Sequence, residues 1–271
     1  MSDPRRALDA IGQLPDVEID IADAALHLAR VDAPDADWQA ARAHLSELAR
    51  EAVRLPGETL AERAESLINL LSSRYGYSGD TERYDDLANA NLIRVIERRR
   101  GLPVALGIIW LHTARSAGWA AHGVDFPAHF LVALKGKSTQ AVLDVFHGGQ
   151  PMDAPELREL LKRIEGDTAE LRPGLLRPMG TRAVLLRLQN NIVSRRLQGG
   201  NLHGALAAIE DMLRIAPDHA ELWRQAGLLN QRLDQVAAAL QDFERFLELS
   251  PDSKAAARVR SAMDELRTRL N

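Results

Sequence analysis

The chain has 271 residues, of which 46% are hydrophobic, and this is enough apolar material for one or two folded domains. Charged residues make up 27% of the chain, and the net charge is −4. This balance excludes the overall positive field that sequence-independent nucleic-acid binding needs, and the composition argues against disorder. Because the chain contains no cysteine, disulfides, thiolate metal sites and cysteine nucleophiles are excluded as well.

The sequence shows neither a signal-peptide pattern nor a membrane-spanning run. An acidic, alanine-rich segment follows the first residues, where a secretory signal would be apolar. The longest apolar run, residues 102–111, contains Pro103 and Gly107 and is too short to span a bilayer. We therefore expect a cytoplasmic protein without a membrane or nucleic-acid partner.

The first third of the chain predicts three amphipathic helices, because apolar residues recur there at helical spacing. Pro56 and Gly57 separate the second helix from the third. The helices are expected at residues 17–31, 38–54 and 59–75. Residues 76–91 are polar and predict a long connection, a feature that is often functional in compact domains.

A short helix is predicted over residues 92–100, and the most apolar helix of the chain follows it. Pro103 suits the first turn of this helix and Gly118 suits its end. Residues 106–111 make it apolar almost all round, so we expect it to be central and buried.

Two strands, at residues 129–134 and 141–146, predict a β-hairpin. If a two-residue type II′ turn centres on Gly136 and Lys137, His129 faces Asp144 on the same side of the sheet. Their β-carbons would then be about 5 Å apart, close enough for the carboxylate to orient the imidazole. A slip of one residue would separate them.

The last third of the chain repeats with a period of 34 residues. Pro217 and Pro251 are separated by this period, and so are Leu206 and Leu240. The period is typical of helix–turn–helix repeats, which predicts two units at residues 186–219 and 220–253. A charged helix over residues 254–270 would cap the array.

Four motifs precede the repeats: NANLIRVI at 89–96, RRGLPVAL at 99–106, GVDFPAHFLV at 123–132 and LDVFHGG at 143–149. In combination, these motifs and the repeats resemble the bacterial transglutaminase-like proteins that carry C-terminal tetratricopeptide repeats, the SirB-like regulator family. The resemblance implies an α+β first domain over residues 1–180, with helical N-terminal segments and a papain-like core containing a small antiparallel sheet. It implies an all-α repeat domain over residues 181–271.

The resemblance also implies where a catalytic triad would lie. In this superfamily a cysteine begins the central helix, a histidine starts a neighbouring strand and an aspartate lies on the next strand. His129 and Asp144 match the last two positions. The nucleophile position falls on Pro103, Val104 or Ala105, and none of these side chains can attack a carbonyl.

Three interpretations of the His129–Asp144 pair stay open: a structural contact between strands, part of a binding pocket, or a general base for water. His147 could add a third metal ligand. However, Asp144 and His147 would leave an extended strand on opposite faces, unless the glycines at 148 and 149 end the strand. We expect no metal and no cofactor.

The repeats predict a groove for an extended peptide, and the alternative is that so short an array only supports the first domain. We therefore expect a regulatory, non-catalytic adaptor with a protein partner. Such a protein would be a pseudoenzyme. The alternative is a hydrolase or isopeptidase that uses His129 and Asp144. The groove candidates are Asn190, Asn191 and Ser194 in the first unit and Arg224, Gln225 and Leu228 in the second.

Overall fold

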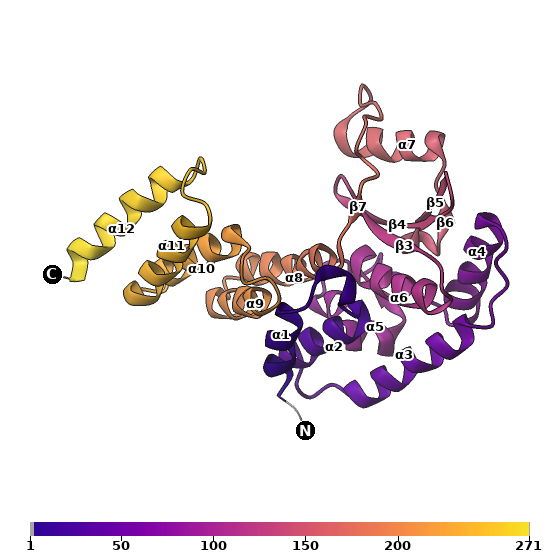
Figure 1. Cartoon of the computed structure of the whole chain (residues 1–271), viewed down its shortest axis with the longest axis horizontal. Coiled ribbons are helices and arrows are strands. Elements are labelled where there is room, and N and C mark those ends of the chain that lie inside the picture. The colour runs from indigo at the N-terminus through magenta and orange to yellow at the C-terminus, as the bar shows by residue number, and fades with distance from the viewer. Residues whose placement is uncertain (1–2, 271) are drawn as a thin grey trace. The chain divides into compact units, whose positions relative to one another are not determined.

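The computed structural model describes residues 3–270, and the chain divides into two compact units (Figure 1). We call Pro15–Leu188 the core unit, and Met1–Leu14 together with Gln189–Asn271 the repeat unit. No helix within the described residues is both long and apolar enough to cross a bilayer.

Helices occur at all three positions predicted in the first third of the chain. The first begins later than expected, because the Asp20 carboxylate accepts the amides of Ala22 and Asp23 and so sets the helix start. The third is a short α-helix that continues as one π-helical segment, Ile68–Arg74. The α-helices are α2 (Ile21–Asp32), α3 (Trp38–Ala52) and α4 (Leu60–Leu67).

The predicted long connection is a structured segment. Its strand β1 (Ser78–Gly79) pairs in parallel with β2 (Arg100–Gly101), and a 3-10 turn, Leu87–Ala90, precedes α5 (Leu92–Arg98). Arg98 binds the Asp80 carboxylate at 2.6 Å. This ion pair ties the polar segment to the end of α5.

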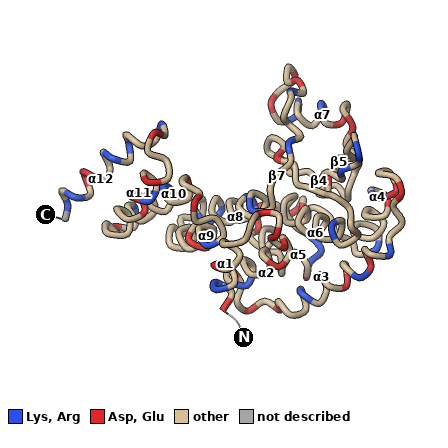
Figure 2. Tube along the Cα trace, in the orientation of Figure 1, with Lys and Arg blue, Asp and Glu red and all other residues tan. Residues whose placement is uncertain are grey.

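Helix α6 (Pro103–Ser116) is the buried centre of the core unit, as predicted. Its side chains from Pro103 to Leu111 are all buried, and Arg115 is its only charged residue, whereas charges are frequent on α3 (Figure 2). Gly107 lets the sheet approach closely, since a Cβ there would lie 2.2 Å from the ring of Phe130. The helix therefore has one face against the sheet and is enclosed by helices elsewhere.

The sheet is antiparallel, with the strand order β6-β5-β4-β3-β7, and it lies between α6 and α7 (Ala154–Glu165) (Figure 1). Leu131 and Ala133 pack with α7 on one face, whereas Phe130 contacts α6 on the other. Covering both faces explains the nearly continuous apolar run of the central strand. The strands are β3 (Ala121–Phe126), β4 (His129–Lys135), β5 (Gln140–Asp144), β6 (Gln150–Pro151) and β7 (Pro178–Met179).

The C-terminal helices match the predicted repeats and cap. The α8–α9 pair ends at Pro217 and the α10–α11 pair ends at Pro251, as the period requires. Gly227 allows close packing, because a Cβ there would lie 2.5 Å from the Phe243 ring. The helices are α8 (Thr181–Gln198), α9 (Leu202–Ile215), α10 (Ala220–Arg232), α11 (Val236–Leu249) and α12 (Ala256–Leu270).

A helix that the sequence analysis did not identify, α1 (Pro4–Gly12), packs on α9 within the repeat unit. Arg5 Nε donates to the buried carboxylate of Asp211 at 2.9 Å. Arg214 Nη1 donates to Asp9 at 2.8 Å. The first residues thus group with the repeat helices, whereas we assigned them to the first domain. The domain limits of 1–180 and 181–271 stay a prediction.

Replacing Ile109 by aspartate should destabilise the core unit severely. Ile109 is 0% exposed, so the new carboxylate would lose its hydration in an apolar environment. We expect the free energy of unfolding in urea to fall by at least about 4 kcal/mol. Val17→Asp is the matched control, since Val17 is 91% exposed. Equal stability of the Ile109→Asp and Val17→Asp variants would contradict the central position of α6.

Replacing Asp16 by alanine should weaken the start of α8. The two oxygens of this carboxylate accept the backbone amides of Thr181 at 2.8 Å and Arg182 at 2.7 Å. Losing such a cap costs about 1 kcal/mol, and urea unfolding measures it. Asp16→Asn keeps one acceptor and should lose less; a larger loss for asparagine than for alanine would argue against the capping role.

Candidate functional site

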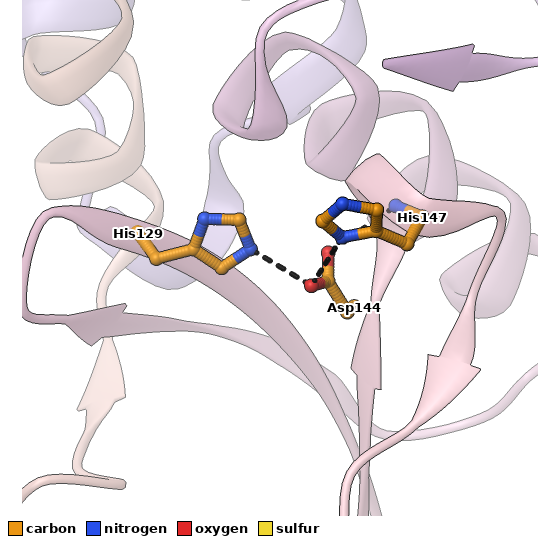
Figure 3. Close-up of side chains that lie close together, drawn as sticks. All are labelled: His129, Asp144 and His147. Atoms are coloured by element: carbon orange, nitrogen blue, oxygen red, sulfur yellow. Dashed lines mark hydrogen bonds and ion pairs between the residues drawn. The ribbon is translucent and has the colours of Figure 1, made fainter. Parts of the chain in front are cut away.

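Three polar side chains meet where the hairpin of β4 and β5 opens (Figure 3). His129 is the first residue of β4, Asp144 is the last residue of β5, and His147 ends the 3-10 turn that follows. One ligand atom from each side chain lies within 4.8 Å of those of the other two. The two residues that the hairpin pattern brought together are therefore close in the structure.

The predicted register of this hairpin was wrong by two residues. Lys135 pairs with Gln140, and Gly136 N donates to Thr139 O at 2.8 Å, so the loop has four residues rather than two. A slip of two preserves which face each side chain occupies, unlike a slip of one. His129 and Asp144 consequently lie on the same face as diagonal neighbours.

The Asp144 carboxylate uses its two oxygens for different purposes. Oδ1 accepts the backbone amides of Phe146 at 3.0 Å and His147 at 3.4 Å. Oδ2 is 2.8 Å from His147 Nδ1 and 3.0 Å from His129 Nε2. The His129 contact has an ion-pair distance without hydrogen-bond alignment, so this buried nitrogen has no hydrogen-bond partner within residues 3–270.

The position of His147 differs from that on an extended strand. The strand ends at Asp144, and the chain turns through Val145–His147 into Gly148 and Gly149, which have φ of 72° and 86°. These left-handed conformations favour glycine. The turn brings His147 back onto the carboxylate, with its side chain 54% exposed.

The environment changes the acidity of Asp144. Burial by itself raises the pKa of this carboxyl, but the contact and positive charge of His129, followed by those of His147, lower the pKa below its usual range. An anionic Asp144 can hold both imidazoles in place. The same carboxylate could polarise His129 as a general base for water.

The start of α6 carries no nucleophile. Pro103, Val104 and Ala105 are buried and apolar, with Val104 2% exposed and Ala105 0% exposed. The chain has no cysteine. The role of His129 and Asp144, whether structural, ligand-binding or catalytic, stays open.

The six groove candidates lie on α8 and α10, the first helices of the two repeats. Asn190 and Ser194 are exposed, and Asn191 accepts a hydrogen bond from Arg195. On α10, Arg224 and Gln225 both donate to Glu221, while Leu228 is 38% exposed. Peptide binding at these six residues stays a prediction.

The structure adds a pocket in the repeat unit that the sequence analysis did not identify. Its volume is about 440 Å³. We call it the acidic pocket, because three carboxylates line it beside one arginine and one tryptophan. Its residues are Asp9, Gln13, Glu210, Leu213, Arg214, Pro217, Trp223, Ala226 and Asp242, which do not include the six groove candidates.

Comparisons with known proteins agree with this architecture. The family model described as the transglutaminase-like superfamily matches residues 39–190, and a tetratricopeptide-repeat model matches residues 195–264. The chain therefore belongs to the transglutaminase-like superfamily and carries C-terminal tetratricopeptide repeats. Such repeats generally mediate protein–protein interactions.

Bacterial relatives place the chain in a narrower group. A UPF0162 protein of Xylella fastidiosa is 34% identical over 72% of this chain and 71% of its own length. The UPF0162 protein PA3419 of Pseudomonas aeruginosa is 31% identical over 97% of this chain and 96% of its own. Protein SirB1 of Salmonella typhimurium is 25% identical over 76% of each chain. These similarities confirm the predicted family.

The lowered pKa of Asp144 predicts a specific acid response. The pKa of Asp144 in the folded protein lies below its value of about 3.9 in the unfolded chain. The ionised carboxylate therefore stabilises the fold at any pH above about 3.9. This stabilisation is lost as the pH falls through the pKa of the folded state. Urea unfolding of wild type and Asp144→Asn should show a stability gap at pH 7 that narrows below about pH 4. A gap that stays constant would contradict the lowered pKa.

Proposed function

We propose that this protein is a non-catalytic regulatory adaptor whose repeat unit binds a basic segment of a partner protein. The acidic pocket is the observation that carries the proposal. Its position in a tetratricopeptide-repeat unit supports a protein partner, and its carboxylates support a lysine or arginine side chain as the bound group.

The charges of the acidic pocket favour a cation. Arg214 is already engaged by Asp9 at 2.8 Å and by Asp211 at 3.5 Å. Its charge lowers the pKa of Glu210, but by less than burial raises it. Burial raises the pKa of Glu210, with a contribution from the neighbouring Asp211. Burial also raises the pKa of Asp242, to about 6, although Asn230 donates to it at 2.7 Å. A bound cation would relieve both costs.

Trp223 supplies the apolar part of the same pocket. Its indole nitrogen donates to Pro217 O at 2.7 Å, which fixes the ring beside Leu213 and Ala226. The stem of a lysine or arginine side chain is apolar and its head is charged. An apolar wall next to carboxylates therefore suits this kind of side chain better than a neutral or acidic one.

The lack of an attacking atom supports the non-catalytic part of the proposal. In this superfamily the imidazole activates a cysteine, and the covalent route depends on that sulfur. Here Pro103, Val104 and Ala105 occupy the corresponding helix start. A hydrolase that activates water through His129 is the second candidate, because the Asp144 carboxylate lies 3.0 Å from its Nε2.

Peptide binding tests the adaptor proposal. Peptides selected from a displayed random library by the full chain should be enriched in lysine or arginine, and fluorescence anisotropy should show that Glu210→Gln with Asp242→Asn weakens their binding about 10-fold or more. Glu244→Gln with Glu248→Gln is the matched control, because it removes two negative charges from exposed positions of α11. Selected peptides without basic residues, or equal affinity for the double variant, would overturn the proposal.

The affinity for a basic peptide should also depend on pH. Because the pKa of Asp242 is about 6, this side chain is mostly neutral at pH 5 and mostly ionised at pH 7. Peptide affinity in wild type should therefore rise over this interval, and the rise should be smaller in Asp242→Asn. The same pH slope in both proteins would show that Asp242 does not contact the cation.

A direct assay separates the two candidate functions. The full chain should not hydrolyse a panel of amide and ester substrates above the buffer rate. Turnover by wild type that is lost in His129→Ala would overturn the non-catalytic proposal and favour water activation by the His129–Asp144 pair. His203→Ala, at an exposed histidine of α9, controls for nonspecific effects.

A further inference from the structure

The cluster of His129, Asp144 and His147 has the composition of a metal site. Two imidazoles and one carboxylate are a frequent ligand set for zinc and for other first-row divalent ions. Oδ2 of Asp144 lies 3.0 Å from His129 Nε2 and 2.8 Å from His147 Nδ1. With zinc–ligand bonds of about 2.0–2.1 Å, ligand atoms of a tetrahedral site lie about 3.3 Å apart. These two separations are close to those needed, and the ligand atoms of the two imidazoles lie within 4.8 Å of each other.

The ligand atoms are oriented by contacts outside the cluster. Two backbone amides hold Oδ1 of Asp144 and leave Oδ2 directed at the imidazoles. Arg187 Nη2 donates to the carbonyl of His129 at 2.5 Å and so holds the start of β4. Such supporting contacts are typical of metal ligands, because they fix the direction of each donor.

The contact between the buried nitrogen of His129 and Asp144 lacks hydrogen-bond alignment, which is a second observation that favours a bound ion. The His129 side chain is 12% exposed, and its Nε2 has no hydrogen-bond partner within residues 3–270. A buried polar atom without a partner is unfavourable in a folded protein. A cation between Nε2 and Oδ2 would replace this misaligned contact with two metal–ligand bonds.

We propose that His129 Nε2, Asp144 Oδ2 and His147 Nδ1 bind one zinc ion. This site is independent of the acidic pocket and of the adaptor function, and it reverses our expectation that the chain holds no metal. His147 is exposed enough to adjust its ring on binding. Zinc is favoured among the common ions because imidazole nitrogens bind it more strongly than they bind magnesium or calcium.

The surroundings leave room for a further ligand. Asp144 and His147 line a pocket of about 290 Å³, together with Glu156, Glu159 and Arg163. The carboxylates of this pocket outnumber its guanidinium group and so favour a cation. Three protein ligands beside an accessible pocket leave a coordination position for water or for an oxygen atom of a bound molecule, unlike closed four-ligand structural sites.

Zinc binding to the tag-free full chain tests the proposal. Competition with a chromophoric chelator should give one zinc ion per chain, and His147→Ala should weaken binding by about 100-fold or more. His129→Gln should have the same effect through the other imidazole. Cobalt is the spectroscopic probe, because tetrahedral cobalt(II) absorbs strongly in the visible, and this absorption should be lost in both variants. His203→Ala is the matched control, since it removes an exposed histidine elsewhere.

The possible outcomes are distinct. Loss of stoichiometric binding in both cluster variants, with wild-type binding in His203→Ala, supports the site. The metal-free variants must have the melting temperature of the metal-free wild type. If His129→Gln unfolds, His147→Ala remains informative, because His147 is half exposed and its replacement should leave the fold intact. Absence of stoichiometric zinc binding in wild type, or binding unchanged in His147→Ala, would overturn the proposal and leave a hydrogen-bonded cluster. Neither result bears on peptide binding in the repeat unit.

Discussion

The burial of α6 is the constraint on which the core unit depends. A helix without a polar side must be covered on every face, and the sheet can cover one of them only because Gly107 admits the Phe130 ring. The sheet in turn is covered by α7 on its other face. The sheet and α7 are therefore both arranged around one apolar helix. The contact of Phe130 with α6 also fixes the position of the preceding residue, His129, at the edge of the sheet where the site forms.

Within the site, the Asp144 carboxylate links the local turn to the side-chain cluster. Its Oδ1 ends the strand by capping the 3-10 turn, and its Oδ2 faces both imidazoles. The same residue thus shapes the backbone and sets the charge of the site. This arrangement does not involve a cysteine, so the pair is compatible with structural, metal-binding and water-activating roles.

The sequence was most informative where a pattern was long. The uniform apolar character of α6 and the 34-residue repeat period both predicted elements that the structure contains. The sequence analysis did not identify three strands. In β3, which includes Gly123, polar and apolar residues alternate only weakly, and β6 and β7 have two residues each. Helix α7 was also missed, although Asp153 and Glu156 form a capping box at its start.

The sequence by itself determined the family, the absence of cysteine and the pairing of His129 with Asp144, because these depend on residue identity and on the face parity of strands. A register error of two residues did not separate that pair, since strand faces alternate with a period of two. Only the structure decided that His147 joins it, because the 3-10 turn Val145–His147, capped by Asp144, ends the strand and turns the chain back. It also decided the acidic pocket, whose carboxylates come from α1, α9 and α11. Residues so far apart in sequence meet only through helix packing, which no local pattern encodes.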